Sequence, residues 1–196
     1  MTFSSGDENA LDVSCLSSGE DEAFDALMQR HGDKLYRYVL RSLQNETEAV
    51  DLVQETFVKV YANRLKFDPS TRFSTWLYTI AANLVRDRFR WRQRHPQVSL
   101  DALNDVTQQS HRDSIPSEAP SPNEALVLAE RSDAVRAAIA SLDDDLRQPL
   151  LLAEYEGFSH AEIGQILGFT PKAVEMRIYR ARQQLRSHLK AWLENS

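Results

Sequence analysis

The stretch that most constrains this fold is 158–186, which carries the signals of two short helices joined by a tight turn. Ser159 stands where the first helix would begin, and Glu162 follows at the spacing of a reciprocal capping box. Gly168 supplies a residue that tolerates a left-handed helix exit. Thr170 then restarts the chain as a cap, with proline at the first helical position. These signals predict a helix-turn-helix, whose second helix enters the major groove of DNA.

The second helix of this motif has an apolar stripe and a basic remainder. The apolar residues recur every three or four positions, as on one buried helix face: Val174, Ile178, Ala181, Leu185 and Leu189. Residues 172–190 contain six Lys or Arg against one acid, Glu175. A basic helix alone is more often an ordinary solvated surface. Combined with a capped helix and a glycine turn, it favours DNA binding.

Charge is distributed unevenly along the chain, whose net charge is −6. Residues 1–29 contain seven acids and no Lys or Arg, and we predict that 1–19 form an acidic mobile tail. The single cysteine, Cys15, excludes an internal disulfide and a multi-cysteine zinc site. No apolar run reaches the ~18 residues of a membrane-spanning helix, and no signal peptide is evident. We therefore expect a cytoplasmic protein with no metal and no cofactor.

Helical spacing dominates from residue 20 onward. We expect helical structure over 20–43, broken near Gly32, and a second helix over about 47–62. The buried stripe of that second helix would consist of Ala49, Val53, Phe57 and Val60. Its far side carries acids and an exposed valine, Val58. That face indicates a surface for a partner, although a solvated face is the commoner explanation of such residues.

A third helix is predicted over 72–94, and it combines arginine with aromatic residues. Phe73, Leu77, Ile80 and Leu84 form its core stripe. Trp76, Tyr78, Phe89 and Trp91 alternate with five arginines, Arg86, Arg88, Arg90, Arg92 and Arg94. Guanidinium groups pair with phosphates and aromatic faces stack on unpaired bases, so we expect single-stranded nucleic acid to bind here. The alternative is that the aromatic residues are core and the arginines only solvate the end of the helix.

The segment 96–123 is polar, acidic and punctuated by proline, which is typical of a linker. The predicted fold class is therefore all-α, with two small helical domains joined by a flexible polar linker. The first domain would span 20–95. The second, with the helix-turn-helix, would span 124–193.

Several sequence blocks together resemble one protein family. They are Asp51-Leu52-Val53-Gln54-Glu55-Thr56-Phe57, Phe73-Ser74-Thr75-Trp76-Leu77-Tyr78, Ile80-Ala81-Ala82-Asn83 with Asp87, and Arg177-Ile178-Tyr179-Arg180-Ala181-Arg182. In this order they resemble bacterial sigma-70-family RNA polymerase initiation factors of the extracytoplasmic-function (ECF) group. The resemblance covers residues 20–95 and 124–192. It implies a sigma region 2 domain, a linker and a sigma region 4 domain.

The resemblance also implies roles for individual residues. The surface that binds core RNA polymerase, through the clamp of the largest subunit, would include Asp51, Leu52, Gln54, Glu55 and Val58. The promoter −10 element and the melted strand would contact Phe67, Asp68, Ser70, Arg72, Trp76, Asn83, Arg86, Asp87 and Arg90. The −35 element would contact Thr170, Lys172, Glu175, Met176, Arg177, Tyr179 and Arg180.

The partners implied are core RNA polymerase (clamp and flap), promoter DNA and an anti-sigma factor, with no small-molecule substrate and no membrane span. Many relatives have a basic residue and then serine where this chain has Glu175 and Met176. Since a carboxylate can accept from the cytosine amino group and methionine can touch the thymine methyl, we expect an altered −35 preference.

Three alternative functions belong to different classes of protein. A conventional dimeric helix-turn-helix regulator would act without polymerase, but it would not account for the arginine-aromatic helix. A nucleic-acid enzyme would need a catalytic constellation, and the sequence shows none, so we expect a protein that is not an enzyme. A regulatory decoy would bind polymerase or an inhibitor but not promoters.

Overall fold

The structure of the chain, a computed structural model, describes residues 5–18, 20–95 and 122–195. Most of the predicted linker, 96–121, lies outside the described residues. The described secondary structure is entirely helical. In chain order it comprises α1 (Ser5–Ser18), α2 (Asp21–Leu43), α3 (Glu46–Asn63), the 3-10 turn η1 (Arg64–Lys66), α4 (Phe73–Arg94), α5 (Pro122–Ala140), α6 (Asp144–Glu154), α7 (His160–Leu167) and α8 (Pro171–Asn195).

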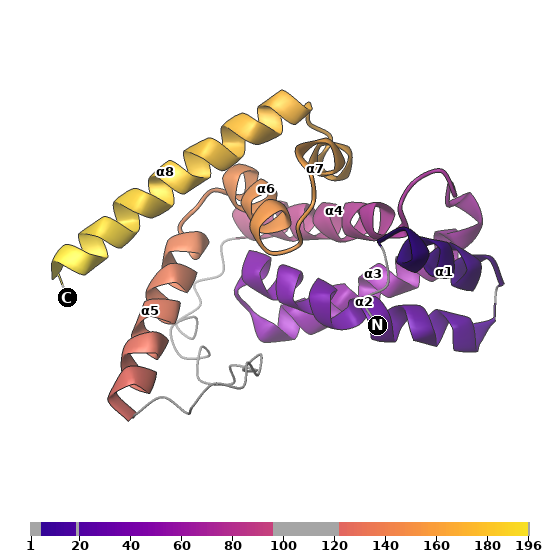
Figure 1. Cartoon of the computed structure of the whole chain (residues 1–196), viewed down its shortest axis with the longest axis horizontal. Helices are drawn as coiled ribbons and strands as arrows, with labels where there is room; N and C mark the ends of the chain where they lie inside the picture. The colour runs from indigo at the N-terminus through magenta and orange to yellow at the C-terminus, as the bar shows by residue number, and fades with distance from the viewer. Residues whose placement is uncertain (1–4, 19, 96–121, 196) are drawn as a thin grey trace.

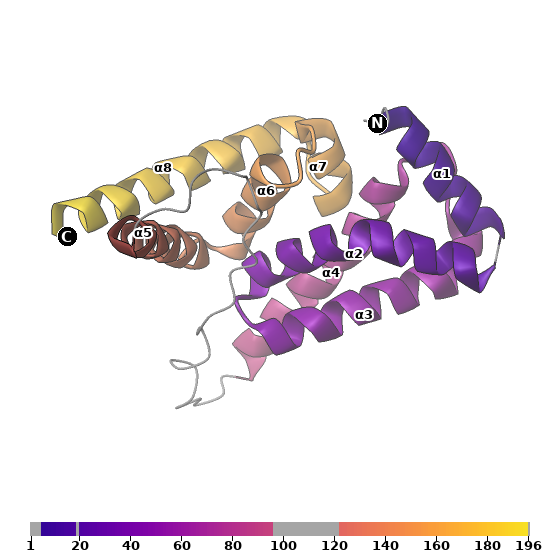
Figure 2. The same cartoon turned by 60° about the horizontal axis from the view of Figure 1, so that its bottom comes forward.

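Helices α2, α3 and α4 pack together as the first helical domain (Figures 1 and 2). The Asn45 side chain starts α3 by accepting from the backbone N–H of Glu48 at 2.9 Å, which satisfies an otherwise unpaired donor. The predicted stripe is buried at Phe57 and Val60. The expected break near Gly32 is wrong, because α2 runs through it without interruption. A glycine inside a helix weakens it by only about 1 kcal/mol, which tertiary packing readily offsets.

The predicted mobile tail differs from the structure, because Ser5–Ser18 form helix α1 against α2 and α4. Leu16 is buried, and the buried carboxylate of Asp12 pairs with Arg30 and, at 2.8 Å, with His31. The Asn9 side-chain oxygen accepts from the backbone N–H of Phe73 at 2.8 Å. The packing of this helix could not be predicted from the composition of residues 1–29, which are acidic, because the basic residues that pair with it begin at residue 30.

Helices α6, α7 and α8 form the second domain, with α5 packed along α8 (Figure 1). The predicted turn is confirmed: Gly168 exits α7 in the left-handed conformation, with φ 75°. The Thr170 hydroxyl accepts from the N–H of Ala173 at 3.2 Å at the start of α8. Val174, Ile178 and Ala181 are buried as expected. Leu151 and Leu152 of α6 are buried in the same core, whereas Tyr155 is 45% exposed.

The two domains pack against each other through α4 with α7 and α2 with α6 (Figure 2). Buried polar groups cross this contact. The Tyr38 hydroxyl donates to the Gln148 side-chain oxygen at 3.1 Å, and the Arg147 guanidinium donates to the Ser42 carbonyl at 2.8 Å. No helix within the described residues is long and apolar enough to cross a membrane.

Candidate nucleic-acid interface

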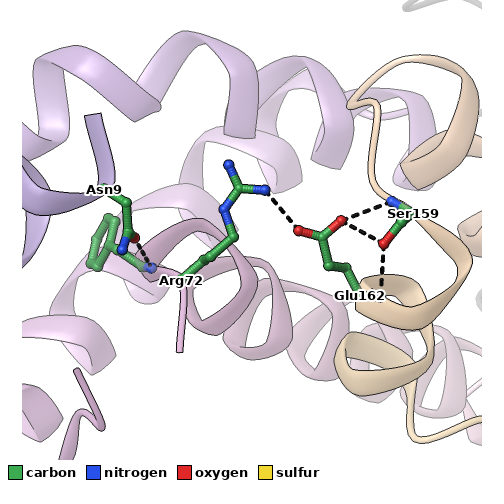
Figure 3. A network of polar contacts seen from close by, with 5 residues as sticks. Asn9, Arg72, Ser159 and Glu162 are labelled. Atoms are coloured by element: carbon green, nitrogen blue, oxygen red, sulfur yellow. Dashed lines mark hydrogen bonds and ion pairs between the residues drawn. The ribbon is translucent and has the colours of Figure 1, made fainter. Parts of the chain in front are cut away.

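The capping box of α7 is present and has a further partner. The N–H of Ser159 donates to the Glu162 carboxylate at 2.9 Å, while the Ser159 hydroxyl oxygen accepts from the N–H of Glu162 at 3.3 Å. The other carboxylate oxygen of Glu162 pairs with Arg72 at 2.8 Å (Figure 3). Burial raises the pKa of Glu162, but the Ser159 hydrogen bonds and the Arg72 charge together lower it below its ordinary value. This carboxylate is therefore charged at neutral pH.

A glycine inside α7 sets the angle of the motif. A Cβ at Gly164 would lie 2.6 Å from the carbonyl oxygen of Phe169, and the N–H of Phe169 donates to the Gly164 carbonyl at 2.9 Å. Only glycine permits this approach, which brings the turn against α7. Gly164 is not among the residues predicted from the sequence. The signal that could have found it was a glycine inside a predicted helix, which often marks close backbone contact.

The outer face of α8 presents the residues predicted for duplex DNA. Lys172, Glu175 and Arg180 are exposed, with Met176 42% and Tyr179 58% exposed. Lys172 donates to Glu175 at 2.9 Å, and this contact lowers the pKa of Glu175. The face therefore combines cations, a charged acceptor and apolar groups, which suits base edges and phosphates alike.

Arg177 differs from the other predicted residues of this helix. It is half-buried, its guanidinium lies 3.9 Å from the Phe169 ring centroid, and it donates to the Ala173 carbonyl at 3.4 Å. It therefore stabilises the turn beside the exposed face.

The loop 67–72 is a hydrogen-bonded turn at the start of α4. The N–H of Ser70 donates to the Asp68 carboxylate at 2.9 Å, and the Thr71 hydroxyl donates to the Asp68 carbonyl at 2.7 Å. The Ser70 hydrogen bond lowers the pKa of Asp68. Phe67 packs against Trp76 with ring centroids 5.1 Å apart. The predicted loop residues are thus brought together beside a half-buried tryptophan.

The four aromatic residues predicted on the exposed part of α4 divide into different environments. Tyr78 is buried, in contact with Tyr38 and with Phe158, so the prediction of an exposed ring is wrong there. Its side of α4 faces the second domain, a contact that helical periodicity does not encode. Phe89 is half-buried beneath the guanidinium of Arg147, as the packing alternative anticipated. Trp91 is 42% exposed.

The arginines of α4 also differ in the partners that they contact. Arg86 donates to the Asn83 side chain at 3.1 Å and to the Leu167 carbonyl at 3.3 Å. Arg90 lies 3.5 Å from Asp87, and both side chains are mostly exposed. Arg88 and Arg92 both pair with Glu48, at 3.8 Å and 2.9 Å, and so join α4 to α3.

The predicted polymerase-binding residues of α3 share one face, with one exception. Asp51, Gln54 and Glu55 are exposed, and Val58 is 67% exposed. Leu52 is only 2% exposed and points into the core, so its assignment to the surface is wrong. Leu52 directly follows Asp51 in the sequence block, but successive helix positions are rotated by about 100°, and this rotation turns Leu52 towards the core.

Comparison with known families identifies both domains. Residues 27–95 match Sigma-70 region 2, and residues 132–185 match Sigma-70, region 4. The chain is 35% identical to ECF RNA polymerase sigma factor SigW of Bacillus subtilis, over 89% of this chain and 93% of that protein. It is 34% identical to RNA polymerase sigma factor CarQ of Myxococcus xanthus, over 87% of this chain and 91% of that protein.

Solved structures have the same architecture. The chain resembles CnrH, solved in complex with the cytosolic domain of CnrY, with a TM-score of 0.66, 30% identity and coverage of 93% of this chain and 97% of that chain. The fold also matches sigma factor RpoE from Bartonella quintana, solved with the anti-sigma factor NepR, with a TM-score of 0.64, 24% identity and coverage of 85% of this chain and 96% of that chain.

Proposed function

The chain belongs to the extracytoplasmic-function group of sigma-70-family RNA polymerase sigma factors, and from this premise we propose that it binds core RNA polymerase and directs it to promoters through their −35 and −10 elements. It would also help to melt the DNA for initiation. The observation that carries the proposal is the presence of region 2 and region 4 in one chain, with similarity to sigma factors along most of its length. No described feature favours an independent dimeric regulator.

The proposed division of labour follows the predicted domain boundaries. Residues 20–95 would bind polymerase and the −10 element, residues 124–193 would bind the −35 element, and 96–123 would connect them. Helix α1 adds a packed element before the first domain.

We assign −35 recognition to the outer face of α8. Tyr179 and Met176 provide exposed apolar contact surface, and Lys172 and Arg180 provide charge for phosphates or guanine. Glu175 would accept a hydrogen bond from cytosine. Arg177 would act through the turn, because its guanidinium lies over Phe169.

We assign −10 recognition to the loop 67–72 and the adjoining face of α4. A base flipped from the promoter would lie against Phe67 and the loop, with Asp68 and Ser70 already fixed by hydrogen bonds. Trp76, Asn83, Asp87 and Arg90 would lie along the edge of the melted region, with Arg72 and Arg86 contacting the strand.

The polymerase-binding surface would be the exposed face of α3, formed by Asp51, Gln54, Glu55 and Val58. Acids around one exposed valine suit a partner with a basic rim and an apolar centre. Region 4 would contact the flap.

The proposed partners include an anti-sigma factor. CnrH was solved with CnrY, and RpoE with the anti-sigma factor NepR. An inhibitor that covers α3 or α8 would block assembly with polymerase. As a sigma factor the chain is a regulatory subunit, and we propose that it acts in the cytoplasm without catalytic chemistry of its own.

A pull-down with core RNA polymerase tests the docking surface. Asp51→Arg reverses a charge on the proposed surface and should weaken binding at least tenfold, since like charges at an interface cost several kcal/mol. Glu8→Arg makes the same change at an exposed position on α1 and should leave binding unchanged. Equal binding by both variants would refute the assignment of this α3 face.

A further inference from the structure

Two arginines assigned to the −10 element bind the helix-turn-helix of the same chain. The Arg72 guanidinium lies 2.8 Å from the Glu162 carboxylate, and these residues are 90 positions apart in sequence (Figure 3). The Arg86 guanidinium donates at 3.3 Å to the carbonyl of Leu167, the last residue of α7. Each end of α7 is therefore held by an arginine from the −10 surface.

Further contacts join α4 and α2 to residues 155–158, which directly precede α7. The Tyr78 hydroxyl donates to the Glu156 carboxylate at 2.6 Å, and the Tyr78 ring packs edge-on against Phe158 with centroids 5.0 Å apart. Arg41 lies over the Tyr155 ring at 4.2 Å. Since α4 also packs against α7 itself, this contact is an extended interface, and the Arg72–Glu162 pair lies at its partly exposed edge.

The −35 surface is arranged differently in this conformation. Lys172 and Tyr179 lie on the outer face of α8 and are exposed. A −35 duplex could approach that face while α7 lies against α4. A −10 strand could not take the positions at Arg72 and Arg86 that α7 occupies.

We propose that the free chain holds itself closed through this interface, with Glu162 and the end of α7 occupying the arginines that would bind the −10 strand. Carboxylate and phosphate oxygens are equivalent acceptors for a guanidinium, so DNA must displace Glu162 to reach Arg72. Glu162 then serves both as the cap of α7 and as an intramolecular competitor of DNA. This proposal rests on the assignment of Arg72 and Arg86 to the −10 element.

The strength of the ion pair suits a reversible contact. The Arg72 side chain is 47% exposed and that of Glu162 21%. A pair this accessible to solvent is worth up to about fivefold in an equilibrium constant. Loss of this pair alone therefore shifts the equilibrium only modestly, so that Glu162 tunes how readily polymerase and promoter open the chain.

The test uses Glu162→Gln in the full chain. Glutamine retains the capping box, because it also accepts at that position, so α7 stays capped while the charge is removed. The matched control is Glu154→Gln, which removes a carboxylate paired with Arg182 at 3.0 Å inside the second domain, away from α4.

Distances between spin labels at Asp25→Cys on α2 and Ser187→Cys on α8, both exposed positions, would report opening in a Cys15→Ser background. We expect Glu162→Gln to increase the open population relative to the closed one about two- to fivefold at low salt. At ~1 M salt, where charges are screened within about 3 Å, the difference should disappear. Glu154→Gln should match the unsubstituted chain. Equal distance distributions for all three proteins at low salt would overturn the proposal.

Binding of a short fluorescent single-stranded DNA oligonucleotide to the free chain supplies the second readout. Glu162→Gln should bind it about two- to fivefold more tightly than Glu154→Gln, because DNA no longer has to displace a carboxylate from Arg72. If Glu162→Gln opens the chain but leaves its DNA affinity unchanged, the claim that Glu162 competes with DNA for Arg72 is overturned. Both measurements omit polymerase, so a failure of the proposed sigma activity in transcription would be seen separately.

Discussion

The turn of the helix-turn-helix depends on the missing side chain at Gly164, and Gly164→Ala tests this directly. An added Cβ would lie 2.6 Å from the carbonyl oxygen of Phe169 and 3.7 Å from the nitrogen of Pro171. Both are backbone atoms of the turn, so a rotamer change cannot relieve the contact. The turn must move away from α7, which shifts α8 and the residues that we propose contact DNA.

The expected change in the free energy of unfolding follows from a comparison with Gly32→Ala. Gly32 also lies inside a helix, but a Cβ there would have no neighbour within 4 Å. That substitution should stabilise the chain by about 0.5–1 kcal/mol through helix propensity alone. At Gly164 the same gain is opposed by overpacking that typically costs about 1–3 kcal/mol. The difference between the two variants isolates the strain.

Thermal unfolding followed by far-ultraviolet circular dichroism measures that difference. For a chain of this length, 1 kcal/mol corresponds to about 2–4 °C, so Gly164→Ala should unfold about 2–12 °C below Gly32→Ala. It should also bind a −35 duplex more weakly, since α8 is displaced. If the two alanine variants unfold at the same temperature, the close approach does not constrain the turn and the inferred strain is refuted.

Three further predictions concern the first helix, the domain contact and the recognition helix. Asn9→Ala should lower the free energy of unfolding in urea by about 0.5–2 kcal/mol, because it removes the cap from the N–H of Phe73; an equal effect of Glu8→Ala, at an exposed neighbour, would contradict this. Burial raises the pKa of Glu156 above its ordinary 4.5, so its contribution to stability is fully present below that value and is lost as the pH rises through the folded-state pKa. Glu156→Gln should remove this pH dependence and stabilise the chain at pH 7; a parallel decline with pH in both proteins would argue against it. Glu175→Arg should change the preferred −35 bases in a panel of substituted promoters, because it exchanges an acceptor for a donor; an identical ranking of promoters would refute that role.

Local signals predicted the second domain well. Ser159, Glu162, Gly168 and Thr170 act through hydrogen bonds and backbone conformations within a few residues, and the structure has the expected helix starts and turn. The family resemblance likewise depended on short blocks that are visible in the sequence. The fold class and the sigma-factor function were therefore predictable.

Contacts between distant segments were not predictable in the same way. The burial of Tyr78 depends on Tyr38 and Phe158, which belong to other segments. The packing of α1 depends on Asp12 meeting Arg30 and His31. Helical periodicity identifies which residues share a face, but not which second element covers that face. These partners are set by tertiary packing.

The candidate site shows the same division. Because the opposite side of α8 is an apolar stripe that faces the core, the sequence predicted the exposure of Lys172, Met176 and Tyr179. Nothing in the local pattern indicated that Arg72 would meet Glu162, since the pairing requires both domains to be in place. The exposure of the α8 face could be predicted from sequence, whereas the pairing of Arg72 with Glu162 could not.

Transcription with purified core RNA polymerase on fragmented genomic DNA of the source bacterium tests the central claim most directly. Sequencing the 5′ ends of the transcripts, with and without this protein, finds its promoters even when their sequences are not specified in advance. The sigma-factor assignment predicts new 5′ ends that appear only when the protein is added and that lie downstream of a shared pair of −35 and −10 motifs. The same set of 5′ ends in both reactions would contradict the assignment of this chain as a promoter-directing sigma factor.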